Sequence, residues 1–181
     1  MPTNSNRKST GVIKMRGDHL LPKDLVSFVP ACENAVEVGV YTGEVTVFFA
    51  ASGKFRQVWA VDPWHNGYDD SDGASDSDMG SVELAFDNRI ATWPMITKLK
   101  MTSIEAASRF PDGYFGLVYI DACHQFEAVC EDINAWLPKV KPGGVLAGHD
   151  YLSFGGVKKA VDELLIGPDR LFDELSWAKM V

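Results

Sequence analysis

The sequence predicts an α/β fold in which helices cover both faces of a doubly wound, mostly parallel sheet. Apolar stretches that resemble strands alternate with helical stretches along most of the chain, and each strand-like stretch ends in a polar residue. Such alternation is typical of parallel sheets, because parallel strands need a crossover connection. A chain of 181 residues is long enough for one domain with a substantial core.

The first strand and its loop organise the chain. Residues 36–43, Val-Glu-Val-Gly-Val-Tyr-Thr-Gly, predict an apolar strand and a tight turn whose backbone N–H groups approach a ligand. We expect Thr42 to cap a helix over residues 44–52, which Gly53 ends. The loop lacks the G-x-G-x-x-G spacing of a dinucleotide site, and Glu37 favours a cationic ligand such as S-adenosylmethionine over a pyrophosphate. The structural alternative is a Glu37 that pairs with a core Arg or Lys.

The remaining elements follow in order. A disordered tail is expected over residues 1–14, and Asp18 and His19 are expected in a solvated loop, with a substrate-gating segment as the alternative. Helices are predicted over residues 22–32, 81–92, 104–109, 125–137 and 157–166. Strands are predicted over residues 57–62, 96–101, 114–120 and 145–148, with a turn at residues 141–144 and a terminal hairpin over residues 170–181 in which Trp177 faces the sheet. Residues 15–181 then form a single domain.

Residues 65–80 form an acidic segment without apolar periodicity, in which aspartates alternate with serine, glycine and alanine. The calcium-loop pattern D-x-[DN]-x-[DN]-G fails, because no glycine follows Asp76. We therefore expect a mobile lid rather than a calcium site.

Charge and cysteine content narrow the class of protein. A net charge of −8 and a pI near 4.9 argue against nucleic acid as the main partner. The three cysteines, Cys32, Cys123 and Cys130, lack metal-site spacing and suggest reduced thiols. No signal peptide and no apolar run of about 20 residues is visible, so we expect a cytoplasmic protein that contacts no membrane.

Polar residues stand at the predicted strand ends, where ligands bind in open α/β sheets. They are Glu37, Asp62, Ser103, Asp121 and Asp150. Asp62 lies 19 residues after Gly43, the distance at which nucleotide sites hold ribose hydroxyls. The bland alternatives are that Asp62 opens a turn with Pro63 and that Ser103 only caps a helix.

The last two strand ends suggest a cation site. Ends of neighbouring strands lie about 4.8 Å apart, so Asp121 and Asp150 are placed to bind one cation together. His124 stands three residues beyond Asp121 and, with an ordinary pKa near 6.5, can accept a proton from a substrate hydroxyl. The alternative is that His124 caps the next helix and Asp150 merely ends a strand.

These features together resemble one protein family. The glycine loop, Val61-Asp62, Ile120-Asp121-Ala122-Cys123-His124, the run from Trp136 to Gly144 and Gly148-His149-Asp150-Tyr151 resemble class I S-adenosylmethionine-dependent methyltransferases. Within these, the chain is similar to the small metal-dependent O-methyltransferases, which include the macrolide-sugar methyltransferases and the cephalosporin-hydroxylase-like proteins. The resemblance covers residues 17–181 and implies a Rossmann-like fold, S-adenosylmethionine, and Mg²⁺ or another divalent metal.

The resemblance also implies roles for individual residues. It assigns the methionine part of the cofactor to Glu37, Gly39, Tyr41, Thr42 and Gly43, the ribose to Asp62, and the adenine side to Trp64 and Ser103. Asp121 is expected to contact the cofactor, take part in catalysis and bind Mg²⁺ with Asp150, while His124 is the general base. His149 stands where some relatives carry a carboxylate, so it joins the metal set, and its imidazole suits Zn, Ni, Fe or Cu better than Mg²⁺.

The sequence thus predicts an O-methyltransferase that acts on a small hydroxylated acceptor with metal assistance. A metal-independent methyltransferase of the same fold and a non-catalytic S-adenosylmethionine-binding protein remain open, whereas Glu37 and the missing dinucleotide spacing disfavour a nicotinamide oxidoreductase. The expected partner is a small-molecule acceptor, with no nucleic acid and no membrane, and a homodimer is a candidate assembly.

Overall fold

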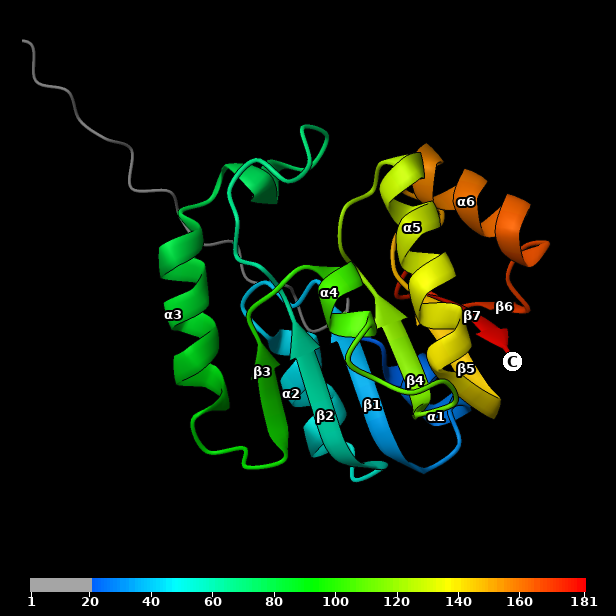
Figure 1. Cartoon of the computed structure of the whole chain (residues 1–181), viewed down its shortest axis with the longest axis horizontal. Coiled ribbons are helices and arrows are strands. Elements are labelled where there is room, and N and C mark those ends of the chain that lie inside the picture. The colour runs from blue at the N-terminus through cyan, green and yellow to red at the C-terminus, as the bar shows by residue number, and fades with distance from the viewer. Residues whose placement is uncertain (1–20) are drawn as a thin grey trace, which may run out of the picture.

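The computed structural model describes residues 21–181, so the tail expected over residues 1–14 and the loop with Asp18 and His19 lie outside the described residues. In the described part of the chain, seven strands form one sheet in the order β3-β2-β1-β4-β5-β7-β6 (Figure 1). The parallel strands are β1 (Cys32–Val38), β2 (Phe55–Val61), β3 (Ile96–Leu99), β4 (Phe115–Ile120) and β5 (Val140–Gly148). β7 (Trp177–Met180) runs antiparallel between β5 and the short β6 (Arg170–Leu171). The predicted doubly wound sheet and terminal hairpin are confirmed.

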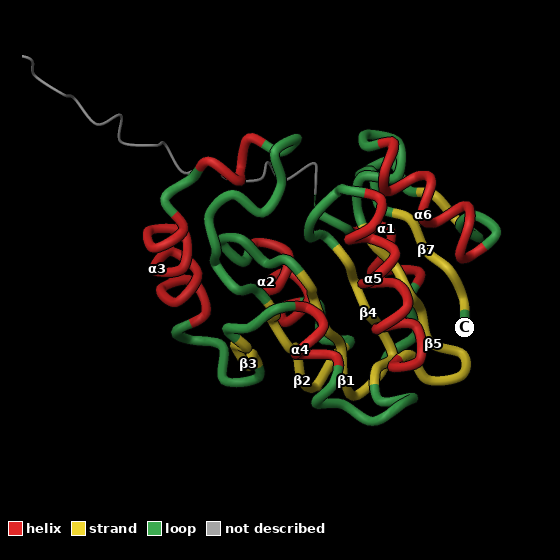
Figure 2. Tube along the Cα trace, turned by 45° about the horizontal axis from the view of Figure 1, so that its top comes forward, coloured by secondary structure: helices red, strands yellow, loops and turns green. Residues whose placement is uncertain are grey.

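Helices cover both faces of this sheet (Figures 1 and 2). One face packs against α1 (Lys23–Phe28), α2 (Glu44–Ala51) and α3 (Met79–Ile90), and the other against α4 (Ser103–Ala107), α5 (Phe126–Trp136) and α6 (Gly155–Leu165). Two short 3₁₀ turns are η2 (Gly73–Asp76) and η3 (Leu137–Lys139). Each face has its own apolar core, because successive side chains of a strand point to opposite faces of the sheet. Ala35 belongs to the core beneath α1, α2 and α3, and its neighbour Val36 belongs to the core beneath α4, α5 and α6.

The topology gathers the loops that follow the parallel strands at one edge of the sheet. The chain leaves β1 towards β2 on one side, whereas β4 pairs on the other side, so the strand order reverses between β1 and β4. Val38 at the end of β1 is in register with Val61 of β2 and Ile120 of β4. Ligands bind at such a reversal in open α/β sheets.

The first predicted helix, over residues 22–32, is too long. It ends at Phe28, because Val29 takes an extended conformation and Pro30 follows. The residue before a proline is disfavoured in the α region, so the helix cannot continue. Cys32 instead begins β1, and its backbone N–H donates to the carbonyl oxygen of Lys54 at 3.0 Å.

The turn predicted at residues 141–144 is also wrong, because these residues belong to β5. They form an irregularity in its pairing with β4, and Gly143 has a φ of +75°. Its N–H donates to the carbonyl oxygen of Val181 at 2.6 Å, so the extra residues are held by the residue that follows β7. The third strand ends at Leu99, two residues before the predicted end at Met101.

Trp177, expected to face the sheet, is a residue of β7 and is 1% exposed within the core beneath α5 and α6. Cys32, Cys123 and Cys130 form no disulfide. Among residues 21–181, no helix combines the length and the apolar character that a membrane crossing requires.

Candidate functional site

The glycine loop packs directly against the end of β4. Gly39 has a φ of +85°, and a Cβ at this position would lie 2.2 Å from the carbonyl oxygen of Asp121. Only glycine permits both the conformation and the contact. Gly43, with a φ of +83°, is the N-cap of α2, and the Thr42 hydroxyl donates to the Glu44 carboxylate at 2.5 Å instead of capping the helix. The expectation that Thr42 is the cap is therefore wrong.

Asp62 holds this loop in place from the end of β2. The backbone N–H groups of Val40 and Tyr41 each donate to its Oδ2 at 3.0 Å, and that of Trp64 donates to its Oδ1 at 2.7 Å. Burial raises the pKa of the Asp62 carboxyl, although these three hydrogen bonds oppose the rise. The carboxyl group is thus part of the scaffold as well as of the cavity wall.

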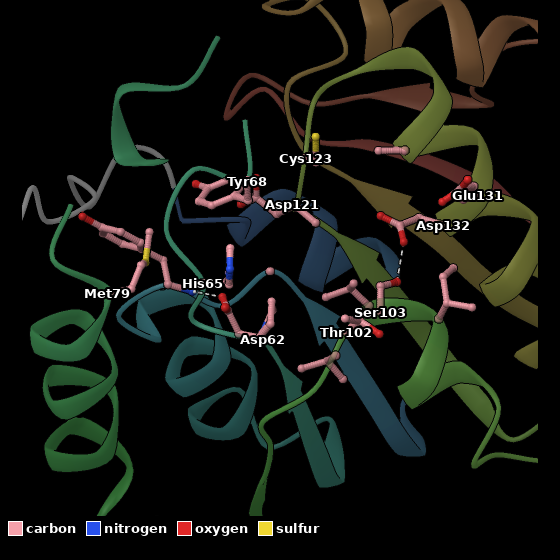
Figure 3. Close-up of a pocket in the computed structure, with 18 residues that line it drawn as sticks. Asp62, His65, Tyr68, Met79, Thr102, Ser103, Asp121, Cys123, Glu131 and Asp132 are labelled. Atoms are coloured by element: carbon pink, nitrogen blue, oxygen red, sulfur yellow. Dashed lines mark hydrogen bonds between the residues drawn. The ribbon is translucent and has the colours of Figure 1, made fainter. Parts of the chain in front are cut away.

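A cavity of about 230 Å³ lies in front of the loop, at the reversal of strand order (Figure 3). Of the residues expected to contact the cofactor, those that line it are Gly39, Tyr41, Asp62, Ser103 and Asp121.

The other predicted cofactor residues, Glu37, Thr42, Gly43 and Trp64, lie outside this lining. Trp64 packs on Phe86 with ring centroids 5.0 Å apart, and its Nε1 donates to the carbonyl oxygen of Tyr41 at 3.0 Å. Glu37 is 2% exposed and accepts a hydrogen bond from Thr46 of α2. These residues support the loop from behind, and their direct contact with a cofactor stays a prediction.

The far end of the cavity contains a buried carboxyl group that sequence reasoning missed. Asp132 of α5 lines the cavity, is 5% exposed and accepts a hydrogen bond from the Ser103 hydroxyl, which in turn accepts one from Trp136 Nε1 at 2.8 Å (Figure 3). Burial raises the pKa of Asp132 to about 6. Ser103 is not the helix cap, because Thr102 caps α4 in a capping box with Glu105.

A cluster of possible metal ligands adjoins the cavity through Asp121. Ligand atoms of Asp121, His124 and Asp150 all lie within 4.8 Å of one another. Nδ1 of His149 lies 2.9 Å from Oδ2 of Asp150 and 3.9 Å from Oδ1 of Asp121. Asp150 has a φ of +64°, a strained conformation for a residue with a side chain. The structure therefore brings together the four residues that the sequence assigned to metal binding and base catalysis. The alternative that His124 caps the next helix is wrong, because Gln125 is the N-cap of α5.

Hydrogen bonding fixes the proton positions on the two histidines. Nε2 of His149 lies 2.9 Å from the carbonyl oxygen of Glu174, which can only accept, so this nitrogen carries the proton. Nδ1 of His124 lies 3.0 Å from Oδ2 of Asp69, and its Nε2 has no hydrogen-bond partner among the described residues. That Nε2 lies 3.3 Å from Oδ2 of Asp150. In their neutral forms, both rings thus direct a lone pair towards one carboxylate.

This arrangement fits a cation. Burial lowers the pKa of His124, but the nearby carboxylates of Asp150 and Asp121 outweigh it and raise the pKa. Burial would raise the pKa of Asp150, yet His124 and His149 hold it far below its usual range. Lone pairs and carboxylates that converge in this way need positive charge between them, either as protons or as a metal ion. Imidazole and carboxylate ligands together suit a transition metal better than Mg²⁺.

The His124 ring is held on both sides. Phe154 stacks on it with ring centroids 3.9 Å apart and an interplanar angle of 9°. Asp69, whose side chain is fully buried, contacts the ring edge at Nδ1. Neither partner was expected, because Asp69 stands 55 residues away among aspartates that the sequence placed in a solvated lid.

The family model described as a methyltransferase domain matches residues 36–151. No curated protein sequence matches the chain. Among solved structures, the O-methyltransferase NovP has a TM-score of 0.61 at 18% identity, over 90% of this chain and 78% of that chain.

Two further solved structures have a similar fold. SMU.1697c from Streptococcus mutans, solved in complex with SAH, has a TM-score of 0.60 at 15% identity, over 87% of this chain and 85% of that chain. An rRNA methylase from Streptococcus thermophilus has a TM-score of 0.56 at 18% identity, over 81% and 76%. At these identities the likeness is one of fold.

Proposed function

This chain belongs to the methyltransferase-domain family, and we propose that it transfers the methyl group of S-adenosylmethionine to a hydroxyl group of a small acceptor with the help of a divalent metal ion. One observation supports the proposal above the others. The cavity at the reversal of strand order and the cluster of Asp121, His124 and Asp150 share Asp121. A cofactor in the cavity and an acceptor at the cluster would therefore meet at this residue.

Each part of the site has a task in this reaction. The backbone around Gly39 and Tyr41 and the carboxyl group of Asp62 would bind the cofactor, because they line the cavity. The acceptor oxygen attacks the methyl carbon as the carbon–sulfur bond breaks, which yields a methyl ether and S-adenosylhomocysteine. Alignment of two bound reactants can contribute about 7–11 kcal/mol to such a step.

The proton of the acceptor hydroxyl goes to Nε2 of His124, the ring nitrogen that Asp69 leaves without a proton. Asp121, His149 and Asp150 would hold the metal ion, with Mg²⁺ as the ion that the family resemblance implies and a transition metal as the ion that the imidazole favours. When bound, the ion lowers the pKa of a coordinated hydroxyl.

A metal-independent reaction is the second candidate. Asp69, His124 and Asp150 already form a hydrogen-bonded or ion-paired series that can hold a proton without a metal ion. Turnover that survives EDTA would select this candidate. A non-catalytic S-adenosylmethionine-binding protein would instead bind the cofactor and release no S-adenosylhomocysteine with any acceptor.

The test combines binding and turnover. Calorimetric titration with S-adenosylhomocysteine and with NAD, each with and without Mg²⁺ or Mn²⁺, identifies the cofactor class. A panel of hydroxylated acceptors is then screened for release of S-adenosylhomocysteine with wild type, Asp150→Ala and the exposed control Asp173→Ala. We expect Asp150→Ala to lower metal-dependent turnover by about 100-fold or more while cofactor affinity stays near the wild-type value.

Undiminished turnover in Asp150→Ala would reject the metal role. Binding of NAD in place of S-adenosylhomocysteine would reject the methyltransferase itself.

A further inference from the structure

We propose that Asp69 is a positioning residue for His124. Asp69 belongs to the acidic segment over residues 65–80. The inference rests on the proposed function, since it names a residue that prepares His124 for that reaction. It concerns a side chain that the cavity lining and the metal cluster both leave out.

Two hydrogen bonds join Asp69 to His124. Oδ2 of Asp69 accepts the backbone N–H of His124 at 2.8 Å and lies 3.0 Å from its Nδ1. The side chains are 0% and 8% exposed, so water does not compete for these contacts. A single carboxylate oxygen therefore fixes both the backbone of the β4–α5 loop at His124 and the edge of the imidazole ring.

The acidic segment holds Asp69 in turn. Its Oδ1 accepts the backbone N–H of Ser71 at 2.9 Å and the Ser71 hydroxyl at 2.6 Å, and its own N–H donates to the Ser75 hydroxyl at 3.1 Å. With the backbone N–H of His124, these donors give the Asp69 carboxylate three hydrogen bonds, none of which requires a proton on the carboxyl group. A carboxylate oxygen only accepts, so Nδ1 of His124 carries the proton.

The position of this proton decides what His124 can do. With the proton on Nδ1, the lone pair of the neutral ring lies on Nε2, which is the nitrogen 3.3 Å from Asp150. The other tautomer would direct an N–H group into the cluster, so it could not accept a proton there and would repel a metal ion held by Asp121, His149 and Asp150. Phe154, stacked on the ring face, restricts its tilt but cannot choose between the tautomers.

Asp69 lies in the segment between β2 and α3, so the position of that segment affects which tautomer His124 adopts. Figure 1 shows that segment above the carboxyl ends of the strands, and Figure 3 shows Tyr68 beside Asp121 over the cavity. His65 and Tyr68 line the cavity, while Asp69, the next residue, reaches His124. The docked segment therefore covers the cofactor site and sets the tautomer of His124 at the same time.

The experiment compares Asp69→Asn with Asp70→Asn, an adjacent exposed position with the same loss of charge. Long-range ¹H–¹⁵N NMR of the metal-free protein, at a pH where its imidazoles are neutral, reports the protonated nitrogen of each of the 4 histidines, and His124→Gln assigns the signals. Calorimetric titration with Mn²⁺ measures the metal affinity of the cluster, and titration with S-adenosylhomocysteine measures the cofactor affinity of the cavity.

We expect wild type and Asp70→Asn to keep the proton on Nδ1 of His124, and Asp69→Asn to lose this preference. Mn²⁺ affinity should fall about 10- to 100-fold in Asp69→Asn alone, the usual effect of changing a carboxylate in the outer shell of a metal site, because the other tautomer of His124 would point an N–H group at the cation. Ser71→Ala, at an exposed position, removes only one hydrogen bond to Asp69. It should change the tautomer of His124 and the Mn²⁺ affinity in the same direction but by less, and it replaces Asp69→Asn if that variant does not fold.

An unchanged tautomer together with unchanged Mn²⁺ affinity in Asp69→Asn would overturn the proposal. If wild type binds no S-adenosylhomocysteine or no Mn²⁺, the proposed function fails, and the NMR comparison still decides the role of Asp69.

Discussion

Thr46 and Glu37 form a buried hydrogen-bonded pair beneath the glycine loop, the hydroxyl of α2 donating to the carboxyl group of β1. Both residues are at most 2% exposed. Because side chains alternate along a strand, Glu37 faces α2 while Val36 and Val38 face the opposite core. The pair therefore ties the strand to the helix on either side of the loop that approaches the cavity.

Thr46→Val tests this tie. The substitution preserves shape but removes a donor to a buried carboxyl group, so the free energy of unfolding should fall by about 1–3 kcal/mol. Chemical denaturation measures the loss, and Glu37→Gln completes a double-mutant cycle. Strictly additive effects of the two substitutions would show that the hydrogen bond contributes nothing to stability.

Gly39→Ala should be far more damaging than Gly53→Ala. Both glycines have positive φ, +85° and +71°, so both substitutions incur backbone strain of about 1–2 kcal/mol. At Gly53 the new Cβ meets nothing within 4 Å, whereas at Gly39 it meets the backbone of Asp121 at 2.2 Å. We expect Gly39→Ala to cost about 2–5 kcal/mol in all. Equal melting temperatures of the two variants would contradict this.

Asp62→Ala should weaken S-adenosylhomocysteine binding by about 10-fold or more, since it removes the acceptor of three backbone N–H groups as well as a cavity wall. Calorimetric titration measures the affinity, and Asp112→Ala, an exposed carboxyl group far along the chain, is the control. Wild-type affinity in Asp62→Ala would remove this residue from the cofactor site.

Asp132 should make stability depend on pH. Its pKa is raised from 3.8 to about 6 by burial, so the native protein binds more protons than the unfolded chain between these values. Stability contributed by this residue is therefore present at low pH and is lost as the pH rises from about 4 to 6, by at most about 3 kcal/mol. Asp132→Asn, which keeps an acceptor for Ser103, should flatten this fall.

The measurement is urea denaturation at several pH values between about 4 and 7. Glu127→Gln, at an exposed position of the same helix, is the control and should leave the pH dependence unchanged. A pH profile of Asp132→Asn that matches wild type would show that Asp132 titrates normally.

The sequence predicted the order of strands and helices because each element carries its own local pattern. Apolar residues such as Ala35, Val36 and Val38 mark the strands, and prolines mark several helix ends. The turn predicted at residues 141–144 was wrong because its glycines fit a turn equally well, and only pairing with Val181 makes them part of β5.

The candidate site was predictable only where its residues follow strands. Asp121 and Asp150 could be brought together from the neighbourhood of β4 and β5 alone. Asp69 and Asp132 could not, because one lies in a segment without periodicity and the other occupies a helix position that looks polar and solvated. Their partners, His124 and Ser103, are 55 and 29 residues away, and no local pattern records such distances.

The central place of β1 has a consequence for synthesis. β1 pairs with β2 on one edge, but its other edge receives β4, whose residues follow much later in the chain. At ribosomal rates of about 5–20 residues per second, that edge stays open for about 4–16 seconds after Val38 emerges. During this interval an apolar strand with unpaired backbone groups is exposed to other nascent chains. Chaperone dependence and temperature-sensitive yield should therefore respond to substitutions in β1 more than to those in β3.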